Sequence, residues 1–162
     1  MTDCKKTVTI NPKQAILFQV EYVNYAWGYQ HNGFFIDNEG YILSYKNPEN
    51  WNWPDKSLSL TGQQVRANLE SCIKTGEKIA AEELIKNAGY IKNIALSKVT
   101  ALKNVAADAG SLKYICYQYS GSSEIYTGYI IKEEGNFTCE NLNFFSKKVT
   151  TWLKRIKDTL NK

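Results

Sequence analysis

Apolar and more polar residues alternate near the start of the chain. Every second position of one set is apolar: Ile16, Phe18, Val20 and Tyr22. The positions between them form a more polar set: Leu17, Gln19, Glu21 and Val23. A period of two is typical of a β-strand with one drier face. We therefore expect the folded domain to begin near Ala15 with a strand.

Two turn signals divide the aromatic run from Tyr25 to Tyr45. The first is His31-Asn32-Gly33, in which Asn-Gly supplies the positive φ of a tight turn. The second is Asp37-Asn38-Glu39-Gly40, which is typical of a type I turn followed by a left-handed glycine. The two signals predict a β-meander of three antiparallel strands.

A second hairpin is expected later in the chain. The β-rich runs Leu112 to Tyr119 and Ile125 to Lys132 are joined by Ser120-Gly121-Ser122-Ser123. With the meander, this predicts an antiparallel sheet of about five strands. The small-residue segment from Val99 to Gly110 fits either a helical turn or a packed crossing segment.

Helical spacing marks two regions between the meander and the hairpin. Thr61-Gly-Gln-Gln64 has the spacing of a capping box, and Gly76 is a plausible stop. Between them lies an apolar stripe made of Val65, Leu69, Cys72 and Ile73. Ala80 to Ser97 also favours helix, with a break expected at Asn87-Ala88-Gly89.

A long amphipathic helix is expected at the end of the chain. Its apolar positions recur at spacings of three, four and seven: Leu142, Phe145, Val149, Trp152, Leu153, Ile156 and Leu160. Such a stripe must cover an apolar surface, and a twisted sheet needs one face buried. We predict a single α+β domain over residues 15–162, its sheet covered on one face by two or three helices, after a flexible arm over residues 1–14.

The amino-acid composition limits the kinds of partner that the protein is expected to bind. Aromatic residues make up 13% of the 162 residues, and the formal net charge is only +4. This charge is far from the concentrated positive field of nucleic-acid-binding domains, so no nucleic-acid partner is expected. No run of about 18 apolar residues is present to cross a bilayer. We expect a monomer or a weak dimer.

The four cysteines show no metal-binding pattern. Cys4, Cys72, Cys116 and Cys139 include no C-x-x-C and have no histidine nearby at ligand spacing. They leave open disulfides, free core thiols and a modified cysteine. Since a buried cysteine behaves as a small hydrophobe, that interpretation is favoured for Cys72 and Cys116. No metal site and no cofactor are expected.

No catalytic constellation stands out. The single histidine, His31, is expected in a hairpin turn without a catalytic role, although a couple with one of the cysteines is conceivable. The adjacent pairs Glu82-Glu83 and Glu133-Glu134 cannot converge on one substrate atom, because neighbouring side chains diverge on a helix or a strand, and we expect them to be solvated. These observations favour a protein that is not an enzyme.

An irregular loop from Asn47 to Ser59 carries two tryptophans. Trp51 and Trp53, with Trp27 and Tyr29 of the meander, form a candidate stacking platform for a sugar or an anchor patch for a protein, because rigid aromatic rings give much contact area at low entropic cost. The alternative is that these rings fold inward over the sheet. We expect Trp53 to be the buried tryptophan of the loop, because Pro54 fixes the chain beside it.

Cys4-Lys5-Lys6, followed by a short polar stretch, resembles the mature start of bacterial lipoproteins. The Gly33-Phe-Phe-Ile-Asp-Asn-Glu-Gly40 segment and the closing helix look like those of small uncharacterised α+β envelope lipoproteins of gut-type bacteria. The resemblance implies a lipid anchor at Cys4, which would then not pair in a disulfide, and a place in the bacterial envelope or outside the cell. It implies no catalytic residue.

The leading hypothesis is therefore a non-enzymatic envelope or secreted module that binds a protein or a carbohydrate and reaches a membrane only through a lipid at Cys4. A second hypothesis is an inhibitor or immunity-type protein that blocks an enzyme. A third is a hydrolase that uses a cysteine nucleophile with His31.

Overall fold

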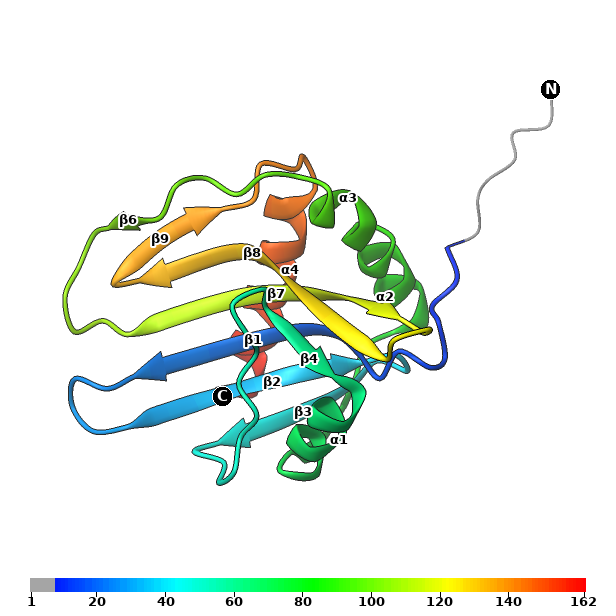
Figure 1. The fold of residues 1–162 in the computed structure, drawn as a ribbon, viewed down its shortest axis with the longest axis horizontal. Helices are drawn as coiled ribbons and strands as arrows, with labels where there is room; N and C mark the ends of the chain where they lie inside the picture. Colours follow the sequence, from blue (N-terminus) through cyan, green and yellow to red (C-terminus); the bar gives the residue numbers. More distant parts are fainter. Residues whose placement is uncertain (1–7) are drawn as a thin grey trace.

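The computed structural model describes residues 8–162. The proposed anchor at Cys4 lies outside these residues. Within them the chain forms nine strands and four helices (Figure 1). The strands are Ile16–Asn24 (β1), Gln30–Asp37 (β2), Tyr41–Lys46 (β3), Ser59–Thr61 (β4), Ile73–Lys78 (β5), Lys103–Asn104 (β6), Ser111–Ser120 (β7), Ile125–Gly135 (β8) and Phe137–Glu140 (β9). The helices are Gly62–Glu70 (α1), Ala81–Ala88 (α2), Ile91–Ala95 (α3) and Ser146–Leu160 (α4).

The strands form one antiparallel sheet in the order β5-β3-β2-β1-β7-β8-β9-β6. The short strand β4 pairs with the N-terminal end of β8. The α+β class is confirmed. The expected number of about five strands is too low, because β4, β5, β6 and β9 extend the sheet beyond the strands that the sequence pattern indicated. The segment from Val99 to Gly110, which the sequence left open, contains β6 and no helix.

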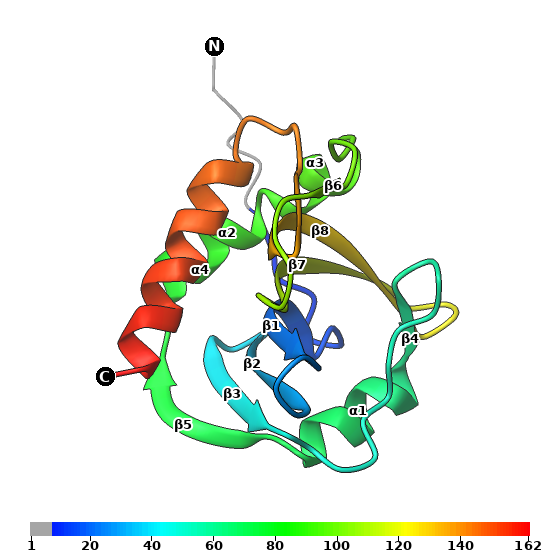
Figure 2. The same ribbon diagram turned by 90° about the vertical axis from the view of Figure 1, so that its left-hand side faces the viewer.

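Both faces of the sheet are covered. The main core lies between the sheet and α2, α3 and α4, while α1, β4 and the loop from 47 to 58 cover the opposite face (Figure 2). The expected cover of helices on one face is present. The helix that begins after Thr61 lies on the other face, where Val65 packs against the sheet.

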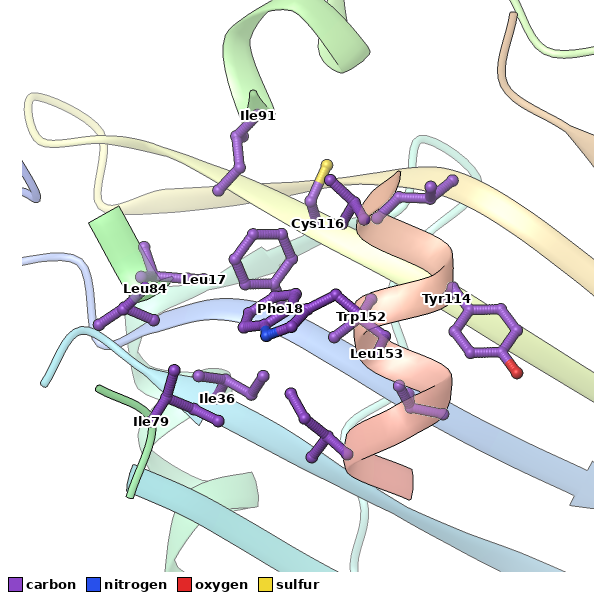
Figure 3. Packing of buried hydrophobic residues seen from close by; sticks show 14 of the residues in the cluster. Leu17, Phe18, Ile36, Ile79, Leu84, Ile91, Tyr114, Cys116, Trp152 and Leu153 are labelled. Carbon is purple, nitrogen blue, oxygen red and sulfur yellow. The ribbon is translucent and has the colours of Figure 1, made fainter. Parts of the chain in front are cut away.

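The stripe of α4 fills the centre of the main core. Trp152 meets the ring of Phe18 edge-on, with the ring centroids 5.1 Å apart (Figure 3). Val149, Leu153 and Ile156 are buried beside it, each contributing about 1.5–3 kcal/mol by burial. The helix has 15 residues and begins at Ser146. Leu142 was predicted to belong to the apolar stripe of this helix, but it precedes the helix and is exposed.

The capping box is confirmed, because Thr61 and Gln64 bond reciprocally at the start of α1. The helix ends earlier than expected, at Glu70. Ile73 is 73% exposed and begins β5, so the apolar stripe did not extend to it. The expected break in the next helix is confirmed by the separation of α2 from α3.

His31-Asn32-Gly33 does not form a turn. These residues lie inside β2, and the chain turns earlier, from Tyr25 to Tyr29, where Gly28 adopts a φ of +97°. Glycine is needed at position 33 because a Cβ there would collide with the Val20 carbonyl and the Tyr45 hydroxyl. Tertiary packing therefore overrides the local turn preference of Asn-Gly.

In the part of the chain that the structure describes, no helix is both long and apolar enough to cross a membrane. The segment before β1 contacts the domain. Gln14 donates to the carbonyl of Tyr117 at 2.8 Å, and Asn38 donates to the carbonyl of Pro12 at 2.8 Å.

Candidate functional site

The turn between β1 and β2 carries three exposed aromatic rings. Trp27 is 80% exposed, Tyr25 70% and Tyr29 45%. The rings of Tyr25 and Tyr29 lie 5.5 Å apart. With Trp53, which is 43% exposed, these residues form what we call the aromatic surface. It includes three of the four aromatic residues singled out in the sequence.

The two tryptophans of the loop have the opposite arrangement to the one expected. Trp51 is the inner ring, 4.4 Å from Tyr45 and nearly parallel to Phe35 at 5.8 Å. Trp53 lies outside, with its ring 4.5 Å from that of His31. The prediction that Trp53 is the buried member was wrong, because Pro54 fixes the backbone without deciding which side chain turns inward.

A buried asparagine holds the tryptophan loop in place. Asn68 of α1 is 1% exposed, and its side-chain amide bonds to the backbone of Asn52, which stands between Trp51 and Trp53. The Asn52 backbone N–H donates to Asn68 Oδ1 at 2.8 Å, and Asn68 Nδ2 donates to the Asn52 carbonyl at 2.8 Å. The exposed ring of Trp53 therefore stands on a fixed backbone. Nothing local in the sequence identified this clamp.

Beneath Trp53 lies a buried pair of polar side chains. Nε2 of His31 is 2.9 Å from Oε1 of Glu21, and the histidine is fully buried. Within the described residues, Nδ1 of His31 has no hydrogen-bond partner. Because aromatic rings enclose His31, it cannot touch a ligand directly and serves to hold Glu21. The expectation that His31 is a turn residue was wrong.

A hydrogen-bonded network extends from this pair. Gln19 Nε2 donates to the Tyr45 hydroxyl at 2.7 Å, and the Tyr117 hydroxyl donates to Gln19 Oε1 at 2.5 Å. Burial, and after it the charge of Glu21, raises the pKa of both tyrosines well above the usual value. The hydroxyls therefore stay protonated. The alternation in the sequence predicted that Gln19 and Glu21 lie on the more polar face of the first strand. Both side chains are instead buried.

A groove of about 710 Å³ runs beside Trp53 and continues the aromatic surface. Glu21 and Lys113, which are cross-strand neighbours of β1 and β7, both line it. Other polar side chains in its wall come from Asn24, Asp108, Ser111 and Asn136. The groove thus combines aromatic rings with hydrogen-bonding groups and nearly balanced charges.

A larger hollow of about 950 Å³ lies on the helix-covered face, near the end of α4. Its floor includes Val20 and Phe34, which belong to the main core. It marks the margin that α4 does not cover, and none of the four aromatic candidates, Trp27, Tyr29, Trp51 and Trp53, lines it.

The other sequence candidates are not brought together. Burial raises the pKa of the Cys72 and Cys116 thiols to about 12 and also raises that of Cys139, and all three are free. No group of three metal-ligating side chains occurs between residues 8 and 162. Of the glutamate pairs, Glu133 is buried, contrary to expectation, and accepts a hydrogen bond from Ser111 at 2.7 Å.

Comparison with known proteins finds no relative of this chain. No family model, no curated protein and no solved structure matches this chain.

Proposed function

We propose that the protein is a non-enzymatic binding module, and that its ligand is a neutral carbohydrate held by the aromatic surface and the adjoining groove. The observation that carries the proposal is the exposed ring of Trp53, fixed over His31 beside a mostly apolar groove in which Glu21 and Lys113 supply polar groups. Aromatic rings offer flat apolar faces to a sugar, at little entropic cost when the ring is already held.

The groove favours a sugar over a protein as the ligand. The centres of protein interfaces are depleted in charged residues, whereas this groove has Glu21 and Lys113 facing the same space. Sugar hydroxyls both donate and accept, so carboxylate, ammonium and amide groups can all bond to them. The near balance of charge gives no advantage to a strongly anionic ligand.

The other two hypotheses have less support. A nucleophilic cysteine must be a thiolate, and the raised pKa values of Cys72 and Cys116 work against that state at neutral pH. An inhibitor or immunity role has no feature of its own in the described residues. A place in the envelope, with a lipid on Cys4, remains part of the proposal.

The test is binding to polysaccharides. The protein is mixed with the neutral polysaccharides cellulose, chitin and starch, and soluble fragments of any that retain it are titrated while tryptophan fluorescence is followed. We expect Trp27→Ala and Trp53→Ala each to weaken binding about tenfold or more, since one stacked ring contributes on the order of 1–2 kcal/mol.

Phe144→Ala is the matched control, because Phe144 is also an exposed ring, at 78%, but lies outside the groove. This variant should bind as the wild type does. The proposal is wrong if the wild type binds none of the polysaccharides, or if both tryptophan variants bind them unchanged. A protein partner lost from the same two variants would replace carbohydrate as the ligand.

A further inference from the structure

Three exposed apolar side chains gather far from the aromatic surface, where α3 ends and α4 begins. Leu96 is 77% exposed, Leu142 63% and Phe144 78%, and we call them the apolar patch. Their segments run side by side, since the N–H of Leu142 donates to the Lys98 carbonyl at 2.9 Å and Asn143 donates to Ser97 at 3.3 Å. The patch is therefore one surface built from two segments.

The turn before α4 inverts the usual order of polar and apolar residues. Asn141 is buried, donates to the Ile94 carbonyl at 3.0 Å and accepts from Ser146 at 2.9 Å. Leu142 and Phe144, which alternate with the asparagines, point outward. Folding alone would favour the reverse pattern. An outward apolar pair on a hydrogen-bonded turn indicates a surface that meets an apolar medium.

The turn is also rigid. Asn143 Oδ1 accepts from the backbone N–H of Phe145 at 2.9 Å, and the ring of Phe145 stacks on that of Tyr90 at 4.2 Å. This packing holds Phe145 inward and leaves Phe144 outward. The exposed rings and chains of the patch are thus fixed by the fold.

Lysines border the apolar patch. Those within a few residues of it along the chain are exposed and make no ion pair within residues 8–162: Lys92, Lys98, Lys147 and Lys148. The Nζ of Lys148 lies 5.6 Å from the centroid of Phe144. Glu140 is the one exposed acid in the two paired segments, 94–100 and 140–144. Apolar side chains ringed by lysines match a bilayer surface, where the apolar groups enter the acyl boundary and the ammonium groups meet lipid phosphates.

We propose that the apolar patch seats the domain on an anionic phospholipid surface. The chain reaches the domain at the same end, because a side chain at Gly89, between α2 and α3, would lie 3.1 Å from Val8. Figure 1 shows this approach beside α2, at the end of the domain away from the turn between β1 and β2. A domain seated this way turns its aromatic surface away from the membrane.

The test measures sedimentation of the full chain with vesicles. Cys4→Ser is introduced in every variant, so that no acyl group contributes. Vesicles consist of phosphatidylcholine alone or mixed with phosphatidylglycerol, at low and at high salt. We expect the protein to bind the mixed vesicles at low salt, and Leu142→Ser with Phe144→Ser to weaken this binding about tenfold or more.

Two further variants separate the contributions. Lys147→Gln with Lys148→Gln should weaken binding to the mixed vesicles only. Ile73→Ser is the matched control, since Ile73 is similarly exposed, at 73%, on β5 at the opposite edge of the sheet, and it should leave vesicle binding unchanged. The proposal is overturned if the starting protein binds neither vesicle, or if the Leu142 and Phe144 variant binds as well as its parent. A dimer in solution that this variant abolishes would assign the patch to a second copy instead.

Discussion

The imidazole of His31 reaches diagonally across two strands to Glu21. Glu21 stands opposite Gly33 in the strand register, and His31 stands opposite Val23. Because Gly33 has no side chain, the imidazole two residues earlier can approach the carboxylate, and the two atoms lie 2.9 Å apart. The pair joins β1 to β2 at the level of the groove, so the shape of the site depends on it.

Removing one member of this pair should be costly. His31→Leu leaves the Glu21 carboxylate buried without its partner, and we expect the free energy of unfolding to fall by about 3–5 kcal/mol. Urea unfolding at neutral pH, followed by circular dichroism, measures it.

The double variant Glu21→Leu with His31→Leu is the control. It removes both polar groups, so it should recover much of the loss. A single variant as stable as the wild type would show that the pair does not stabilise the fold.

The clamp on the tryptophan loop gives a second expectation. Asn68→Ala removes both hydrogen bonds to the backbone of Asn52 and leaves two partly buried backbone groups unpaired, which costs on the order of 2–4 kcal/mol. We also expect faster proteolysis within residues 47–58 and an altered emission spectrum from Trp51 and Trp53. Limited proteolysis and fluorescence measure these changes.

Asn52→Ala is the matched variant. It loses only the bond from Asn52 Nδ2 to Asn68 Oδ1, which is 3.1 Å long, and keeps both backbone bonds. Its effect should stay within about 1 kcal/mol. Equal effects of the two variants would contradict the assigned role of Asn68.

Long elements were predictable from the sequence and short ones were not. The pattern indicated β1, β7, β8 and the stripe of α4, because each spans enough residues to show a period. Of the missed strands, β4, β6 and β9 have three, two and four residues, whereas β5 has six and was missed because its first residue, Ile73, fitted the apolar stripe of the preceding helix. The three shorter segments show no period, and their pairing with β8 or β9 depends on contacts that form only in the folded chain.

The candidate site was predictable only in part. Trp51 and Trp53 could be proposed as candidates because two tryptophans in one irregular loop are unusual in composition. The bond between Glu21 and His31 could not be foreseen, because local turn chemistry placed His31 in a turn, whereas the packing of Tyr45 against Gly33 places it in a strand. Asn68 was likewise missed, since its partner is 16 residues away in a segment without regular structure.

The thiols of half-buried Cys72 and buried Cys116 should react slowly. For Cys72 and Cys116, burial raises the pKa from 9.0 to about 12, which lowers the thiolate fraction at neutral pH about a thousandfold. We expect both to react with iodoacetamide far more slowly in the native protein than in urea. Mass spectrometry of tryptic peptides after timed alkylation measures each rate. Rapid native labelling of either residue would instead support the hydrolase hypothesis.

Glu134 should make stability depend on pH. Its Oε1 accepts from Lys154 Nζ at 2.7 Å and lies 3.1 Å from Lys132 Nζ. Partial burial opposes ionisation, but the hydrogen bonds and charges of the two lysines outweigh it and lower the pKa of Glu134. A carboxyl with a lowered folded-state pKa adds stability that is full above its unfolded pKa of about 4.3 and is lost as pH falls through the folded value.

Glu134→Gln should therefore lower the free energy of unfolding at neutral pH, by a small amount because solvent screens the pair. The difference from the wild type should shrink below about pH 4.3 and vanish once the native carboxyl is protonated. Urea unfolding across this range measures it. Glu140→Gln, which removes an exposed carboxylate outside the described ion pairs, is the control. A difference for Glu134→Gln that stayed constant with pH would mean that the lost contact is not one of charge.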